Sequence, residues 1–268
     1  MADARAEIGI FGGSGFYAFL DQVTEVKVDT PYGAPSDRIA LAELSGKRVA
    51  FLPRHGKGHE IPPHKINYRA NLWALRSLGV TRVLSPCAAG SLSPAVKPGD
   101  FVVVDQFVDR TRGRVDTYYD GPIVTHVSCA EPFCPELRSL AVSVTRSLGI
   151  NCHDRGTSVV ISGPRFSSVA ESRWFSKAGW EVINMTLYPE VVLARELELC
   201  YASIALITDY DAGLEGDPSV PHVRTRDVLG VLKSNTERVK AMLHGLVGQV
   251  PTARGCECGS ALKFARLD

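Results

Sequence analysis

Short apolar runs that read as strands alternate with amphipathic helical segments along most of the chain. Expected strands begin at Ile8, Val49, Val80, Phe101, Ser158 and Tyr201, with one more ending at Ile183; expected helices are Asn67–Gly79, Pro135–Leu148, Glu171–Lys177, Val191–Cys200 and Thr225–Gln249. Such alternation predicts an α/β fold in which a mixed central β-sheet is flanked by helices on both faces.

The length of 268 residues and the hydrophobic content of 45% suffice for one large α/β core or two small ones. We expect a single domain over residues 1–250 and a C-terminal tail over residues 251–268. Lys and Arg number 30 against 29 Asp and Glu, and no basic block occurs, which argues against a nucleic-acid binder. No apolar run is long enough for a membrane span, and the N-terminus does not read as a leader, so a cytoplasmic protein is expected.

The stretch Glu181–Glu190 is a strand that feeds a helix, with Pro189 in the first helical turn. Asn184, Met185 and Thr186 fall at the carboxyl end of the strand, where open α/β sheets bind ligands. Free backbone N–H groups and the Thr186 hydroxyl would suit an anionic or hydroxylated ligand. The alternative is a plain helix start capped by Thr186.

A glycine-rich turn follows the first strand and contains Ser14. Glycines let the backbone approach a ligand, so this turn is a candidate phosphate or substrate loop, the alternative being an ordinary tight turn. Residues 13–18 also fit a loose dinucleotide-binding pattern, but the helix that this pattern requires does not follow.

Arg54 and His55 end the next strand and supply donors that suit phosphate. His55 and His59 have the spacing of a helical zinc pair, but Gly56 and Gly58 make a helix there improbable. Further on, Cys87 and Ala88 lie at a second junction between a strand and a glycine, where small side chains let the main chain lie close to a bound group.

Asp209 and Asp211 end the strand that begins at Tyr201. If the chain stays extended, both carboxylates point to one face, where each raises the pKa of the other. One could then hold a proton near neutral pH and donate it. The alternative is a pair of solvated loop acids.

Seven cysteines occur, and Cys256 and Cys258 form a Cys-x-Cys pair in the polar tail. A metal site needs further ligands and the tail supplies none, so we expect a solvent-exposed, oxidisable pair and no metal.

Eight motifs occur in one order: Gly12–Gly15, Arg54–Gly56, Asn67–Asn71, Ala130–Pro135, Gly163–Ser168, Asn184–Thr186, Pro189–Glu190 and Thr208–Asp211. Each is weak alone, but the ordered set resembles the trimeric purine nucleoside phosphorylases, most closely the methylthioadenosine phosphorylases. The resemblance runs from about Ile8 to Gly248. It implies phosphorolysis of a nucleoside by a homotrimer, with inorganic phosphate as co-substrate and no cofactor.

The resemblance also implies roles for individual residues. The phosphate site would comprise Ser14, Arg54, His55, Cys87, Ala88 and Thr186. The nucleoside site would comprise Met185, Phe166, Asp209, Tyr210 and Asp211, together with His126 from a neighbouring subunit. The residues that set specificity would be Ser167, Thr225, Val228 and Leu229. Asp209 would protonate the departing purine, which requires a raised pKa. Carboxylates accept hydrogen bonds from the amino group of adenine, and the apolar Val228 and Leu229 favour a 5′-thioether.

Two departures from the family affect the expected specificity. Cys87 stands where a threonine is usual, and Thr225 stands where a valine usually lines the 5′ pocket. The more polar pocket leaves adenosine open as a substrate. Other readings are a 6-oxopurine nucleoside phosphorylase, a dinucleotide-dependent oxidoreductase and a nucleoside-binding module without catalysis.

Overall fold

The computed structural model describes residues 5–12, 20, 22–213, 220 and 222–266. The strands are β1 (Ile8–Gly12), β2 (Thr24–Val26), β3 (Ile39–Leu44), β4 (Lys47–Pro53), β5 (Arg82–Ser91), β6 (Phe101–Val103), β7 (Gln106–Arg110), β8 (Cys152–His153), β9 (Thr157–Ile161), β10 (Val182–Asn184) and β11 (Cys200–Asp209). The α-helices are α1 (Tyr68–Ser77), α2 (Pro135–Ser147), α3 (Val169–Lys177), α4 (Leu187–Glu196) and α5 (Thr225–Gln249), with short 3-10 helices η2 (Pro63–Lys65) and η3 (Glu257–Ser260).

All of these strands belong to one mixed sheet, as expected. The strand order is β2-β3-β4-β1-β5-β10-β9-β7. Beside this path, β11 pairs with β5 and β6, and β6 pairs with β8. Pairing is parallel between β1 and β4, β1 and β5, and β5 and β11, and antiparallel between β5 and β10.

The long strand β5 divides the sheet. Along one edge, residues 82–84 of β5 pair with β1, and residues 90–91 pair with β10. The other edge pairs with β11 from Arg82 to Gly90. The first edge is therefore open between Ser85 and Ala89, and the sheet splits at this point.

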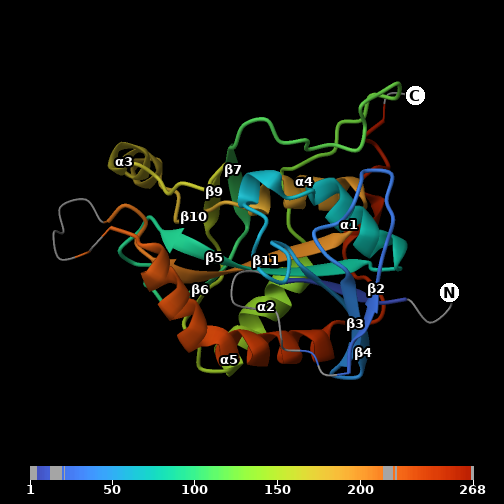
Figure 1. Ribbon diagram of the computed structural model, residues 1–268, viewed down its shortest axis with the longest axis horizontal. Coiled ribbons are helices and arrows are strands. Elements are labelled where there is room, and N and C mark those ends of the chain that lie inside the picture. The colour runs from blue at the N-terminus through green and yellow to red at the C-terminus, as the bar shows by residue number, and fades with distance from the viewer. Residues whose placement is uncertain (1–4, 13–19, 21, 214–219, 221, 267–268) are drawn as a thin grey trace.

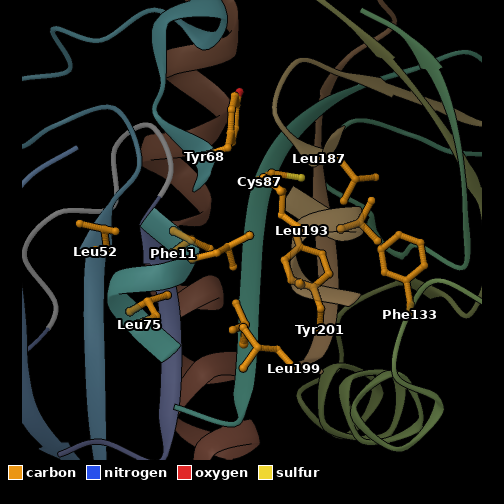
Figure 2. Packing of buried hydrophobic residues seen from close by; sticks show 14 of the residues in the cluster. Phe11, Leu52, Tyr68, Leu75, Cys87, Phe133, Leu187, Leu193, Leu199 and Tyr201 are labelled. Carbon is orange, nitrogen blue, oxygen red and sulfur yellow. The ribbon is translucent and has the colours of Figure 1, made fainter. Parts of the chain in front are cut away.

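Helices cover both faces of the sheet. Figure 1 shows α1 and α4 on one face and α2 and α5 on the other. Each face has its own apolar core: Leu72 and Leu193 belong to the first, and Leu137 and Leu243 to the second. Figure 2 shows the first of these cores, in which Leu193 and Tyr201 pack together beside β5. The α/β fold with a mixed sheet is therefore confirmed.

Several boundaries differ from expectation. The expected strand from Phe101 to Phe107 is two strands, β6 and β7, and β2, β3 and β8 carried no clear sequence signal. The helix expected at Val191–Cys200 is instead α4, because the helix already begins at Leu187 and Cys200 begins β11. Tyr188 has non-helical dihedral angles inside α4, as the residue before a proline usually does.

Within the described residues, no helix combines the length and the apolar character needed to cross a bilayer.

Candidate functional site

A cavity of about 510 Å³ opens where the sheet splits at β5. Its lining includes twelve of the residues singled out from the sequence: Arg54, His55, Cys87, Ala88, Phe166, Met185, Thr186, Asp209, Asp211, Thr225, Val228 and Leu229. These side chains come from segments far apart in the chain, and the fold brings them to one place.

Arg54 lies directly after β4 and is 1% exposed. The buried Glu190 of α4 binds its guanidinium group through Nε and Nη2, and Nη2 also donates to the Ser85 hydroxyl at 2.6 Å. Tyr201 donates to the Glu190 carboxylate at 2.8 Å. Burial opposes the charge of Arg54, but the Glu190 carboxylate outweighs this and raises the Arg54 pKa. Arg54 is thus a fixed cation at the cavity wall, whose Nη1 finds no acceptor among the described residues.

His55 is oriented by its neighbour Ile61. The Nδ1 atom lies 2.8 Å from the Ile61 carbonyl oxygen, and because a carbonyl only accepts, Nδ1 carries the hydrogen. Burial lowers the His55 pKa to about 4, so the ring is neutral near pH 7. His55 was expected to be a second donor to phosphate. In this tautomer Nε2 is an acceptor, and the ring can instead take a hydrogen bond from a protonated phosphate oxygen or a hydroxyl.

Cys87 occupies the open edge of β5. Asn184 donates to its sulfur at 3.4 Å, and the Ser203 hydroxyl lies 3.7 Å from it. Burial raises the pKa of the Cys87 thiol, so it stays protonated. Ala88 follows as a small residue on the same wall.

Thr186 is the N-cap residue of α4, but its side chain makes no capping hydrogen bond. The side-chain Oδ1 of Asn184 accepts from the Leu187 N–H at 3.4 Å instead. Thr186 is 7% exposed and lines the cavity, so its hydroxyl remains available to a ligand. The alternative, in which Thr186 serves only to cap the helix, is therefore wrong.

Asp209 and Asp211 both line the cavity, although not for the reason expected. β11 ends at Asp209, and Asp211 has a positive φ of 47°, so the strand alternation does not extend to it. Thr208 donates to the Asp209 carboxylate at 2.6 Å, and the Asp211 N–H donates to it at 2.7 Å. Burial raises the Asp211 pKa, with the Ser172 and Ser167 hydroxyls opposing the rise. The raised pKa expected for Asp209 stays a prediction.

The rim of the cavity is formed by the first turns of α5, which contribute Thr225, Val228 and Leu229. Leu229 is 51% exposed, an unusual position for a large apolar side chain. Phe166 lies on the loop before α3.

Of the expected site residues that the structure describes, three do not line this cavity. Ser14 lies outside the described residues. Tyr210 and Ser167 are half-buried near the two acids, and neither lines the cavity. His126 is exposed, and its N–H donates to the Ala265 carbonyl at 2.7 Å, so the same chain does not bring it to the site.

Three important residues had no assigned role in the sequence analysis. Glu190 was overlooked, although a buried arginine requires a buried counter-charge. Gly90 leaves room for the acids, because a Cβ there would lie 3.0 Å from an Asp209 oxygen. Arg114 donates to the carbonyl oxygens of Met185 and Ser162 at 2.8 and 3.0 Å, and also to that of Tyr188, which fixes the backbone beneath the cavity. Arg114 lies in a loop, and no sequence pattern indicated its role.

The tail also differs from expectation. Cys258 is 4% exposed and Ala265 is 5% exposed, so the tail packs against the body of the protein instead of standing in solvent.

His55 and His59 do not lie on a helix, since residues 54–59 form turns, as expected from Gly56 and Gly58.

Comparison with known proteins finds relatives in both sequence and fold. The profile of the family described as "Phosphorylase superfamily" matches residues 7–248. A purine nucleoside phosphorylase of Streptomyces coelicolor is 54% identical, with 96% of this chain and 95% of the relative covered. An S-methyl-5′-thioadenosine phosphorylase of Thermofilum pendens is 53% identical, with 98% and 99% covered. A solved mutant of the adenosine/methylthioadenosine phosphorylase of Schistosoma mansoni, in complex with tubercidin, superposes with a TM-score of 0.90 at 36% identity, covering 98% of this chain and 99% of that one.

Proposed function

Because the chain belongs to the phosphorylase superfamily, we propose that it cleaves S-methyl-5′-thioadenosine with inorganic phosphate. The products are adenine and 5-methylthioribose 1-phosphate. One observation carries the proposal: a single cavity holds a buried, ion-paired arginine and, on another part of its wall, two carboxylic acids. Relatives at about half identity over nearly the whole chain carry this enzyme name.

The Arg54 end of the cavity would bind phosphate. Nη1 of Arg54 and the Thr186 hydroxyl are donors, and Ala88 allows the main chain to approach. Cleavage of the glycosidic bond builds positive charge on the ribose, and a phosphate dianion held beneath the sugar stabilises that charge before attacking the anomeric carbon. Holding both reactants in line supplies a large part of the rate gain.

The acidic end would bind the base. Asp209 donates a proton to N7 of the departing purine, which leaves as neutral adenine rather than as an anion. Asp211 accepts a hydrogen bond from the 6-amino group when it is ionised. A 6-oxopurine would instead place an oxygen against a carboxylate oxygen, so adenine is favoured over hypoxanthine.

The middle and rim of the cavity would hold the sugar and the 5′ substituent. Met185 lies against the ribose, and Phe166 forms a wall near the sugar and base. Val228 and Leu229 supply apolar surface for the methylthio group. We also propose that the active unit is a homotrimer in which His126 of a neighbouring subunit completes this end. A place in purine and methionine salvage follows from the two products, and a cytoplasmic location stays a sequence-based prediction.

Adenosine is a second candidate substrate. Thr225 places a hydroxyl at the rim, which a 5′-hydroxyl can use, and the Schistosoma mansoni relative is named for both adenosine and methylthioadenosine.

Release of free base from methylthioadenosine, adenosine and inosine, each with and without phosphate, tests the proposal. We expect adenine from methylthioadenosine only when phosphate is present, slower release from adenosine and little hypoxanthine. Base release that is independent of phosphate would contradict phosphorolysis, and inosine as the best substrate would contradict the adenine assignment.

Asp209→Asn tests the proton donor. We expect kcat for methylthioadenosine to fall by about 10²–10⁴-fold, the usual contribution of a general acid. Asp29→Asn is the matched control, because the Asp29 side chain is 88% exposed on the surface. Unchanged kcat in Asp209→Asn would remove Asp209 from this role.

A further inference from the structure

Four cysteines from three separate chain segments converge beside the second core. Cys134 directly precedes α2, Cys200 begins β11, and Cys256 and Cys258 belong to the C-terminal tail around η3. Their sulfur atoms all lie within 4.8 Å of one another. The Cys256 sulfur is 3.6 Å from that of Cys134 and 3.3 Å from that of Cys200.

The spacing of the sulfurs suits a metal ion better than a covalent bond between any pair. A disulfide joins two sulfurs at about 2.05 Å. In a tetrahedral zinc tetrathiolate, Zn–S bonds of about 2.3 Å place the sulfurs about 3.8 Å apart. The separations of 3.3 and 3.6 Å are closer to the second value. Three of the four cysteines are buried, and Cys256 is in partial contact with solvent.

The surroundings suit a negatively charged cluster, because zinc with four thiolates carries a net charge of −2. The first turn of α2 supplies its N-terminal dipole, and the Leu137 N–H donates to the Cys134 sulfur at 3.5 Å. On the tail, the Arg254 guanidinium lies beside Gly259, next in sequence to Cys258. A Cβ at Gly259 would be 2.5 Å from Nη2 of Arg254, so the guanidinium packs directly against this glycine.

We propose that Cys134, Cys200, Cys256 and Cys258 form a structural site for zinc or a similar soft divalent ion. The site joins the C-terminal tail to α2 and β11. It replaces the expectation of a metal-free protein, which rested on the tail alone and did not consider ligands from other segments.

Fixing the tail would also affect a second segment of the chain, because tail residues beyond the proposed metal site bind to that segment. Ala265 accepts from the His126 N–H, and Arg266 forms a β-bridge with Thr125. Figure 1 shows the red C-terminal segment beside this green loop. The metal would therefore fix the backbone of the loop that carries His126. The metal site itself does not depend on the proposed function.

The first experiment measures metal in the full chain, purified under reducing conditions and supplied with zinc alone. We expect about one zinc per chain by elemental analysis, in line with a Cys₄ structural site. The cobalt-substituted protein should show the intense sulfur-to-cobalt charge-transfer band and visible bands of a tetrahedral tetrathiolate. Negligible zinc, or a cobalt spectrum of octahedral type without charge transfer, would overturn the proposal.

The second experiment identifies the ligands. Cys258→Ser and Cys256→Ser should lose the zinc and the cobalt spectrum, while Cys152→Ser, a buried cysteine outside the cluster, should retain both. In the wild type, the four thiols should resist alkylation until a chelator is added. Peptide mapping of that preparation that finds disulfides within this set would refute the metal site. Should the serine variants fail to fold, the cobalt spectrum of the wild type still decides.

Discussion

At the scale of single residues, the site depends on how Arg54 is kept charged and still while almost wholly buried. An unpaired buried charge is costly, and the bidentate contact with Glu190 removes that penalty. Ser85 accepts a second hydrogen bond from Nη2 of Arg54, and Tyr201 donates to the Glu190 carboxylate, which leaves Nη1 to face a ligand. A cation built in this way is oriented before phosphate arrives, so little side-chain entropy is lost on binding.

Glu190→Gln should therefore weaken both the fold and phosphate binding. Removing one partner of a buried ion pair costs roughly 3–5 kcal/mol of unfolding free energy. We also expect KM for phosphate to rise by roughly tenfold, a loss of about 1.4 kcal/mol. Urea unfolding and initial rates at varied phosphate measure the two effects.

Glu196→Gln is the matched control for this change. Glu196 is a buried glutamate of the same helix that lies outside the cavity. Its partners in the described part of the chain are the Thr117 hydroxyl and the Tyr118 N–H, both at 2.7 Å. We expect a stability loss of about 1 kcal/mol or less and an unchanged KM for phosphate. Equal effects in the two variants would show that the ion pair with Arg54 has no special role.

His55 makes stability depend on pH. Its pKa is lowered by burial to about 4 in the folded protein, against about 6.5 in an unfolded chain. Between these values the unfolded chain binds a proton that the folded chain does not, so stability decreases as pH falls through this window. From pH 7 to pH 5 the loss is about 2 kcal/mol.

Urea unfolding at several pH values measures this effect. His55→Gln should flatten the profile between pH 4 and 6.5, while His64→Gln, which changes an exposed histidine, should not. A profile that keeps its slope in His55→Gln would assign the pH dependence to other groups.

At the scale of elements, the sequence predicted helix boundaries best where the hydrophobic periodicity extends over many residues. α5 has the expected bounds, and α1 and α2 differ from expectation by one or two residues at their ends. Periodicity could not reveal β8 or the break between β6 and β7, because two or three residues carry too little pattern. Most cavity residues were found because they sit where strands end. Glu190 and Arg114 were missed because their roles come from contacts across the fold.

Two glycines of α5 should respond in opposite directions to alanine. Nothing lies within 4 Å of a Cβ added at Gly230, so Gly230→Ala should stabilise the protein by about 0.5–1 kcal/mol through helix propensity. A Cβ at Gly245 would be 2.7 Å from the Val144 side chain in α2, and the stiff valine cannot move away easily. Gly245→Ala should therefore destabilise the protein, as thermal unfolding of both variants can test. The same sign for both would show that α2 and α5 are not packed as described.

At the scale of the whole molecule, the proposed trimer makes a prediction that no single chain can show. If His126 serves a neighbouring subunit, Asp209→Asn and His126→Ala act on different sites when the variants are refolded together. Mixed trimers should then contain some intact sites and should exceed the summed activity of the separate variants at low nucleoside concentration.

The control for this experiment mixes Asp209→Asn with Arg54→Ala. Both residues line the cavity of their own chain, so no mixed trimer holds an intact site and no activity should be recovered. Recovery in this control, or none in the His126→Ala mixture, would contradict a site shared between subunits.

The open edge of β5 has a mechanical consequence. One continuous strand passes from Ser85, which contacts Arg54, to Gly90 beside the acids, so both ends of the cavity rest against the same strand. They cannot separate and rejoin as hinged lobes do. Entry and exit of ligands must then be governed by the outer margin, where the first turns of α5 and the loop before α3 stand, and substitutions there should alter the rate of product escape before they alter bond cleavage.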